Sequence, residues 1–405
     1  MKSWGELSKM RKILLVQPDF PQPKKTRIEH SAVPIGLLKI GTYYRHSAGL
    51  PVKLVRGKKP IRFHPDEILV TSLFTYWSQY VKDSVDYYRS RFPHAKIVVG
   101  GIYASLMPDH CRQNTKAEVH VGLHNPSEEW CRSNPLDYSL LDDDIDFQIL
   151  HGMRGCFRRC KFCGTWKIEP DMTFEGDVAK RVASNHVIFY DNNFLKNRHI
   201  RDVLRELSAV RIGGRKVRYE CQSGFDGRIL DGELAGLLKK AGFVNPRIAW
   251  DNSYDDWRMI GRQIRMLEKA GYRKKDIYVF ILYNWDHLYR VVEKKRRKCW
   301  DFGVQIADCR FRPLDQTYDN FNACFDQTYR DYHIHKGWTD REVKLFRKNV
   351  RRHNICVRHS FEFHSKVLEN KRVPRSAYRV LNTRSKRDIL KKYPDAWWPD
   401  EIHSP

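Results

Sequence analysis

The sequence predicts an α/β protein with an N-terminal domain built on a parallel sheet, then a partial parallel barrel, and then a basic C-terminal extension. The first observation is the length of 405 residues, which exceeds the size of one ordinary hydrophobic core. The second is that short apolar runs alternate with helical patterns over residues 12–315. The third is a change of composition near residue 316, after which Arg, Lys and Tyr become frequent.

Residues 11–135 carry the first alternation of strands and helices. Short, largely apolar runs are candidates for strands buried on both faces: KILLVQP (12–18), PVKLVRG (51–57), EILVTSLFT (67–75) and KIVVGGIYASL (96–106). Helical spacing appears at 34–49 and 81–92. Alternation of this kind predicts a parallel, Rossmann-like sheet with helices on its faces. The acidic stretch 136–146 has no convincing period, so we expect a linker there.

Residues 147–315 repeat the alternation with a more regular rhythm. Six strand candidates recur about every 30 residues: FQILHGM (147–153), HVIFYDNN (186–193), VRYECQSG (217–224), PRIAWDN (246–252), DIYVFILYN (276–284) and FGVQIADCRF (302–311). This spacing favours an incomplete TIM-type barrel, (β/α)6, over an open sheet, and in such barrels the chemistry lies at the C-terminal ends of the strands. The extension 316–405 should contain a basic amphipathic helix at 339–353, opened by a capping box of Thr339 and Glu342.

The chain is strongly basic, because 74 Lys and Arg residues against 48 Asp and Glu give a formal net charge of +26. Nucleic acid, an acidic electron donor and a phosphorylated small substrate all fit such a charge. No run approaches the roughly 20 apolar residues of a membrane span, and the N-terminus lacks the apolar core of a signal peptide. We therefore expect a cytoplasmic protein with no membrane contact, whose ten cysteines are reduced or bind metal.

Three cysteines cluster just beyond the first barrel strand, where a site is expected: Cys156, Cys160 and Cys163. Three thiolates can bind three irons of a 4Fe-4S cube and leave the fourth iron open for a ligand from outside the protein. The alternative is a zinc site, in which His151 would complete a tetrahedron with the three thiolates. The flanking cations favour thiolates in both cases: Arg154, Arg158, Arg159 and Lys161.

The spacing Cys-x3-Cys-x2-Cys, with Phe162 just before the last cysteine, resembles the signature of the radical S-adenosylmethionine (radical SAM) superfamily. The resemblance implies that the cysteines hold a 4Fe-4S cluster, with Phe162 and Gly164 beside the cofactors. It also implies that S-adenosylmethionine chelates the open iron and is cleaved reductively to a 5'-deoxyadenosyl radical. That radical would abstract hydrogen from the substrate. A reducing partner such as flavodoxin or ferredoxin would supply the electron.

Other family positions can be carried over where residues match. The second strand ends in YDNNF instead of the usual Gly-Gly-Glu, so Asp191 and Asn193 are candidates for the amino group of the methionine moiety. The fourth strand ends in WDNS, which makes Asp251 a candidate for the ribose hydroxyls; a helix cap is its alternative role. On the fifth strand, VFILYNWD (279–286) keeps Ile281 beside the expected adenine but lacks the two glycines of the family pattern.

The N-terminal domain resembles the cobalamin-binding-type domain that precedes many radical SAM barrels, through HSAVPIGLLKIGTYYR, ILVTSLFTYW and IVVGGIYASLMPDHC. The usual cobalamin motif, Asp-x-His-x-x-Gly, should follow the first strand, but QPDFPQPKKTRIEH (17–30) does not contain it. The missing motif weighs against cobalamin but leaves it open. The domain's other role would be to cap the barrel and shape the substrate pocket.

The substrate class stays open between small molecule, peptide and nucleic acid. Three tryptophans among the cations of the extension suit stacking on bases: Trp338, Trp397 and Trp398. A second hypothesis is therefore a nucleic-acid-binding protein with a structural zinc or a non-catalytic iron–sulfur site. We interpret the basic run EKKRRKCW (293–300) as a solvated helix face.

Overall fold

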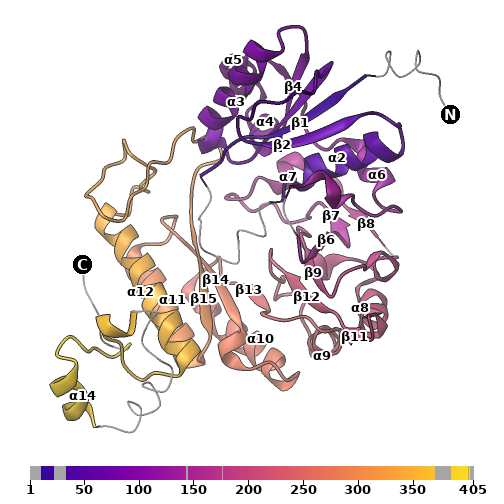
Figure 1. Ribbon diagram of the computed structural model, residues 1–405. Helices are drawn as coiled ribbons and strands as arrows, with labels where there is room; N and C mark the ends of the chain where they lie inside the picture. Colours follow the sequence, from indigo (N-terminus) through magenta and orange to yellow (C-terminus); the bar gives the residue numbers. More distant parts are fainter. Residues whose placement is uncertain are drawn as a thin grey trace. The chain divides into compact units, whose positions relative to one another are not determined.

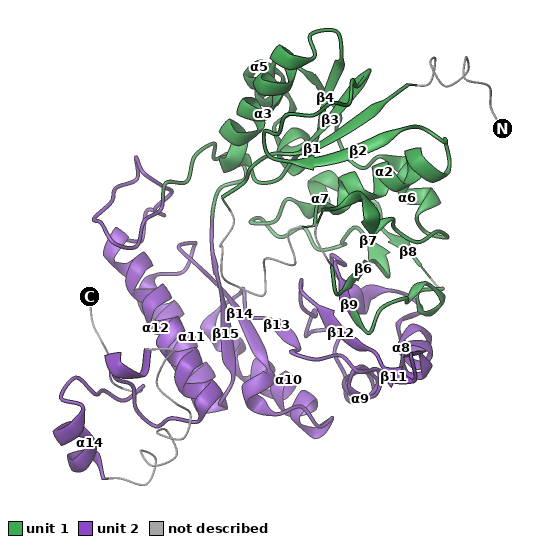
Figure 2. Cartoon of the chain, viewed as in Figure 1, with its two compact units in different colours: residues 1–186, 312–320 green, residues 187–311, 321–405 purple. Residues whose placement is uncertain are grey.

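The structure is a computed structural model that describes residues 11–21, 33–142, 145–175, 177–369, 385–399 and 401. The chain divides into two compact units (Figure 2). Unit 1 comprises residues 1–186 and 312–320, and unit 2 comprises 187–311 and 321–405. These units do not follow the expected domain bounds, which stay a prediction. Residues 143 and 144 of the expected linker, and 370–384, 400 and 402–405 of the expected extension, lie outside the described residues.

Unit 1 is built on a five-stranded sheet with the order β2-β1-β3-β4-β5. Every pairing in it is parallel, as the sequence predicted. The strands are β1 (Ile13–Gln17), β2 (Val52–Arg56), β3 (Glu67–Ser72), β4 (Lys96–Gly101) and β5 (Glu118–Val119). All five residues of β1 are buried, as expected for a central strand of a doubly wound sheet. In this order the direction of winding changes between β1 and β3, and ligands of such sheets bind at that point.

Helices cover the sheet of unit 1: α2 (Ile35–His46), α3 (Ser78–Arg91), α4 (Ile102–Leu106), α5 (Pro108–Thr115) and α6 (Asn125–Trp130). Between them lie the 3-10 turns η2 (Thr75–Trp77) and η3 (Tyr138–Leu140). Gly41 lets α2 approach the sheet, since a Cβ at this position would lie 2.6 Å from Cδ1 of Leu15. The helix and β1 therefore pack in close contact.

The remainder of unit 1 carries the cysteine loop. Its elements are β6 (Gln148–Leu150), β7 (Met153–Arg154), α7 (Thr165–Ile168), β8 (Thr173–Phe174) and η4 (Ala179–Arg181). The strand expected at 147–153 is thus present as two shorter strands. β7 pairs with β8 in an antiparallel ladder, Met153 opposite Phe174 and Arg154 opposite Thr173. The cysteines lie between the end of β7 and the start of α7.

Unit 2 alternates strands with helices along the chain, as the sequence predicted (Figure 1). Its strands are β9 (His186–Phe189), β10 (Arg211–Ile212), β11 (Arg215–Lys216), β12 (Arg218–Cys221), β13 (Arg247–Ala249), β14 (Tyr278–Tyr283) and β15 (Gln305–Arg310). Its helices are α8 (Ile200–Ala209), α9 (Gly232–Ala241), α10 (Trp257–Lys269), α11 (Tyr289–Phe302), α12 (Asp340–His359) and α14 (Lys386–Lys392). Short 3-10 turns are η5 (Phe194–Lys196), η6 (Tyr254–Asp256), η7 (Lys274–Asp276) and η8 (Lys366–Glu369). The order β13-β14-β15 is parallel throughout.

Helix α12 protects β15, the edge strand of this three-stranded sheet. The capping box of Thr339 and Glu342 is present, and the helix runs beyond the expected residue 353 to His359. In the second half of α12, the side chain of Asn354 donates to the Ile306 carbonyl at 2.7 Å and accepts from the Ile306 amide at 2.8 Å. The side-chain amide thus takes the place of a neighbouring strand at one residue of the edge.

The interpretation of EKKRRKCW as a solvated helix face is wrong. Glu293, Lys295 and Arg296 of this run are buried in α11. Arg296 Nε donates to Glu293 Oε1 at 2.7 Å, and Lys295 Nζ donates to the carbonyl of Trp250 at 3.1 Å. Burial is tolerated because each charge finds a partner inside the unit.

None of the helices in the described ranges combines the length and the apolar character that crossing a bilayer requires.

Candidate functional site

The cysteine loop begins at a glycine that the backbone requires. Gly155 has a φ of +74°, and a Cβ there would lie 2.1 Å from the carbonyl oxygen of Asp171. Any other residue would therefore displace the backbone on the far side of the loop. Directly after this turn come the three cysteines, which are half-buried and not disulfide-bonded.

Hydrogen bonds within the loop fix its shape. The Arg158 amide donates to Sγ of Cys156 at 3.4 Å. The Cys163 amide and Nε1 of Trp166 both donate to the Cys160 carbonyl, each at 3.1 Å. The loop is thus held by its own backbone and by one indole.

The loop offers three half-buried thiols as metal donors. Within the part of the chain that the structure describes, no group of three or more His, Cys, Asp or Glu side chains is arranged to hold a metal ion. His151, the expected fourth zinc ligand, has its Nε2 2.8 Å from Nη1 of Arg154.

The two loop residues expected beside the cofactors flank Cys163. Gly164 precedes α7, and a Cβ added there would lie 3.2 Å from both methyl carbons of Leu106 in α4. Phe162 is half-buried. The close packing against Leu106 therefore explains a glycine at position 164 without a cofactor. A contact of Phe162 or Gly164 with a cofactor stays a prediction.

In unit 2, polar side chains follow the ends of β9 and β12. Asp191 is fully buried and Asn193 is nearly so. Nδ2 of Asn193 lies 3.5 Å from Oδ2 of Asp226, a residue that we did not predict. Asp226 also accepts from Nε of Arg228 at 2.8 Å. Its position directly after the third barrel strand, in SGFDGRIL, is the signal that could have found it.

Asp251 follows β13 and belongs to the same polar group. Burial raises the pKa of its carboxyl, which Lys295 and Arg228 oppose and Asp226 reinforces. It caps no helix: Ser253 caps η6, and Asp256 precedes α10. The alternative role as a cap is therefore wrong.

Lys295 of α11 holds the turn that contains Asp251. Its Nζ donates to the carbonyls of Trp250 and Asn252, the residues on either side. Burial lowers the pKa of Lys295 to about 8, against the attraction of Asp251. This buried lysine thus fixes the backbone of the turn and supplies a cation near the carboxylate.

Ile281 lies in β14 on the face that the helices of unit 2 cover. Val279, Ile281 and Tyr283 are buried, whereas Phe280 and Leu282 between them are only half-buried. The ring of Tyr283 lies 4.9 Å from that of Phe346 in α12. Because neighbouring residues of a strand point to opposite faces, Phe280 and Leu282 belong to the more accessible face. The adenine contact of Ile281 stays a prediction.

Unit 1 also contains a cavity of about 300 Å³ between α2, α6 and one face of the sheet. Alternate residues of β3 and β4 line it, including Leu69 and Val98, and His120 and His124 border it. Of the stretch 17–30, where a cobalamin motif would stand, residues 22–30 lie outside the described part of the chain.

Comparison with solved structures finds the same fold in TsrM from Kitasatospora setae, a radical S-adenosylmethionine methyltransferase. Its structure with cobalamin and a [4Fe-4S] cluster matches with a TM-score of 0.60 and 14% identity, over 76% of this chain and 76% of that chain. Its structure with tryptophan substrate and the SAM analogue aza-SAM matches with a TM-score of 0.54 and 14% identity, over 75% and 73%. No protein-family model and no curated protein matches the sequence. The chain thus shares its fold with this radical SAM methyltransferase, the fold that the sequence predicted.

Proposed function

We propose that this protein is a radical SAM enzyme whose Cys156, Cys160 and Cys163 hold a 4Fe-4S cluster. The observation that carries the proposal is the three-cysteine loop, which lies within a fold shared with TsrM. Bound to these thiolates, the cluster would supply an open iron and the electron that cleaves S-adenosylmethionine to a 5'-deoxyadenosyl radical. Gly155 and the Arg158 amide would hold the loop in shape for it.

In unit 2, the polar residues that follow the strands would bind S-adenosylmethionine. Asn193 and Asp226 already share a contact, and their amide and carboxylate suit an ammonium group. The Asp251 carboxylate would accept hydrogen bonds from the ribose hydroxyls, on a turn that Lys295 holds. Burial of these groups strengthens each hydrogen bond that they make.

The first experiment measures 5'-deoxyadenosine released from S-adenosylmethionine by anaerobically reconstituted, reduced protein. We expect product and about four irons per chain from the wild type. The variant with Cys156, Cys160 and Cys163 all changed to Ala should give neither. A Cys324→Ala variant is the matched control, because that cysteine is exposed and lies outside the loop.

The outcome also separates the proposal from the second hypothesis. S-adenosylhomocysteine measured in the same samples would reveal methyl transfer, the activity named for TsrM. Zinc instead of iron in the purified protein, with no product from S-adenosylmethionine, would reject the radical SAM proposal in favour of a zinc-containing binding protein.

Cobalamin is a separate proposal. The similar TsrM structure contains cobalamin, and unit 1 has a cavity against its sheet. The missing Asp-x-His-x-x-Gly motif means that a bound corrinoid would have no histidine ligand from that motif. Incubation with hydroxocobalamin, desalting and an absorption spectrum test it. A corrinoid spectrum retained at one equivalent would support binding, and a colourless desalted apoprotein would reject it.

A further inference from the structure

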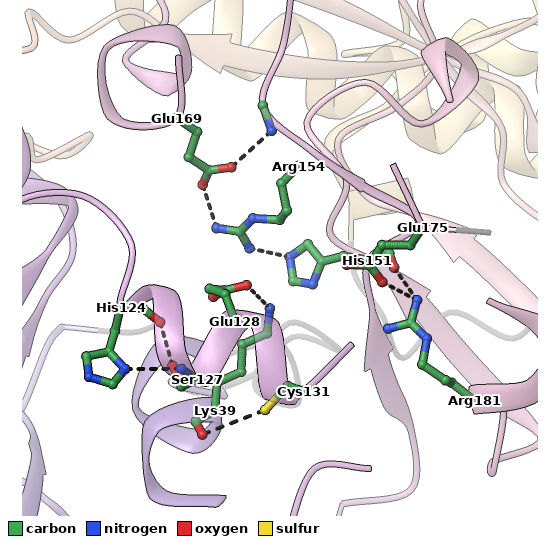
Figure 3. A network of polar contacts seen from close by, with 11 residues as sticks. Lys39, His124, Ser127, Glu128, Cys131, His151, Arg154, Glu169, Glu175 and Arg181 are labelled. Carbon is green, nitrogen blue, oxygen red and sulfur yellow. Dashed lines mark hydrogen bonds and ion pairs between the residues drawn. The ribbon is translucent and has the colours of Figure 1, made fainter. Parts of the chain in front are cut away.

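A buried ion pair joins the start of the cysteine loop to the residue that follows α7 (Figure 3). Arg154 stands just before the loop, at the end of β7, and Glu169 stands just after α7. Nη2 of Arg154 donates to Oε1 of Glu169 at 2.6 Å, and both side chains are 13% exposed. The other carboxylate oxygen accepts from the Gly155 amide at 3.2 Å. One carboxylate therefore holds the residue before the loop and the first residue of the loop.

A neutral histidine holds the guanidinium from the other side. Nη1 of Arg154 lies 2.8 Å from Nε2 of His151. Arginine is always a donor, so Nε2 must be the acceptor and His151 must be neutral. Burial and the nearby cations Lys39, Arg154 and Arg181 place the pKa of His151 well below its usual value. Arg181 also donates to the His151 carbonyl at 2.8 Å, which fixes the backbone of this histidine.

The same network reaches the helices of the N-terminal sheet. Lys39 of α2 and Glu128 of α6 form an ion pair at 2.5 Å, and Figure 3 shows it beside Arg154. Burial raises the pKa of Glu128, but Lys39 and Arg154 outweigh that effect and the net shift is downward. The ionised Glu128 therefore attracts Arg154 as well as Lys39. A displacement of Arg154 would break its contacts with Glu169 and His151 and weaken its attraction to Glu128.

We infer that Arg154 and Glu169 are positioning residues for the cluster: they tie the start of the cysteine loop to the end of α7, the helix that follows the loop, and thereby fix the separation of its three thiolates. This inference rests on the proposed function. A buried ion pair contributes little net stability, because desolvation offsets the attraction, but a hydrogen-bonded guanidinium–carboxylate pair defines geometry closely. Partners that orient metal ligands in this way typically change metal affinity about 10- to 100-fold when they are replaced.

The test uses the reconstituted holoenzyme and its Glu169→Gln and Arg154→Lys variants. Two properties of the cluster are measured: the rate at which a ferrous chelator removes iron, and the electron paramagnetic resonance spectrum of the reduced state. We expect iron loss to become about 10- to 100-fold faster in Glu169→Gln, with a broadened spectrum. Arg154→Lys keeps the charge but loses the planar fork, so we expect an intermediate effect.

Asp177→Asn is the matched control, because Asp177 forms an exposed ion pair with Lys180 in the same unit. It should behave as the wild type. In the double variant Arg154→Lys/Glu169→Gln, iron loss should be no faster than in the worse single variant, since the two residues act as one unit. Thermal unfolding of each variant identifies a general loss of fold; if Glu169→Gln does not fold, Arg154→Lys decides.

The outcomes distinguish the inference from the proposed function. Unchanged iron loss and an unchanged spectrum in the folded variants would overturn the positioning role while the cluster itself stands. A wild-type protein that assembles no cluster under the same conditions would reject the proposed function, and the inference with it.

Discussion

Among the single residues, Asp251 has a predicted role, binding of the ribose hydroxyls, that one substitution can test directly. Its carboxylate lies on a turn held by Lys295, and burial strengthens the hydrogen bonds that it would offer to a ribose. We expect Asp251→Asn to weaken binding of S-adenosylmethionine about 10-fold or more, as for other hydrogen bonds to charged groups. Isothermal titration of the reconstituted protein measures it. Asp255→Asn, an exposed change four residues further on, should leave the affinity unchanged.

Asp308 makes stability depend on pH. Burial raises its pKa to about 6, with Arg347 opposing, against 3.8 for an unperturbed group. Between these values the folded state binds more protons than the unfolded state, so stability should fall as the pH rises from 3.8 to 6. Asp308→Asn removes this fall and should stabilise the protein at pH 7 by up to about 3 kcal/mol. The free energy of unfolding in urea, measured at pH 4 and pH 7, tests this prediction. Asp326→Asn, a change at an exposed residue, is the control. An equal pH dependence of stability in Asp308→Asn and the wild type would contradict the prediction.

Among the helices and strands, the contact of Asn354 with β15 should contribute measurably to stability. Asn354→Ala would leave the amide and the carbonyl of Ile306 without this partner. We expect a loss of about 1–3 kcal/mol in stability and faster hydrogen exchange at the Ile306 amide. Lys348→Ala, on the exposed side of α12, is the control and should change neither. Unaltered exchange in Asn354→Ala would show that the edge is protected by other means.

Features that depend on residues close together in sequence were predictable. Features that depend on contacts between residues far apart in sequence were not. The capping box of Thr339 and Glu342 lies within four residues, and its helix formed as expected. The buried charges of α11 are the opposite case, because Lys295 finds its partners at residues 250 and 252, far away in sequence. A helical pattern of lysines and arginines gives no sign of such partners. The contact of Asp226 with Asn193 was hidden for the same reason, because the two residues follow different strands.

At the scale of the whole molecule, the net charge of +26 should steer an acidic electron donor. We expect the rate of reduction by flavodoxin to fall at least about 10-fold between low and high ionic strength. Turnover of S-adenosylmethionine by protein reduced beforehand is the control and should depend much less on salt. A reduction rate independent of salt would mean that the positive charge does not guide the donor.

For the molecule as a whole, the fold class could be predicted because the alternation of strands and helices is visible in the sequence as short apolar runs separated by helical patterns. The parallel sheet of unit 1 and the alternation of unit 2 both follow from that rhythm. The order β2-β1-β3-β4-β5 could not be read in advance, since several orders satisfy the same alternation. Nor could the split near residue 186, which depends on which elements pack together rather than on composition.

The contact of Asn354 in α12 with the edge strand β15 has a practical consequence for fragments of this protein. A chain cut before residue 340 would keep all of β14 and β15 but lose the helix that packs on them (Figure 1). The bare edge of β15 would then be a template for strands of other copies. Such truncated protein should accumulate in inclusion bodies. A fragment that extends through His359 keeps α12 over the edge strand and should not self-associate in this way.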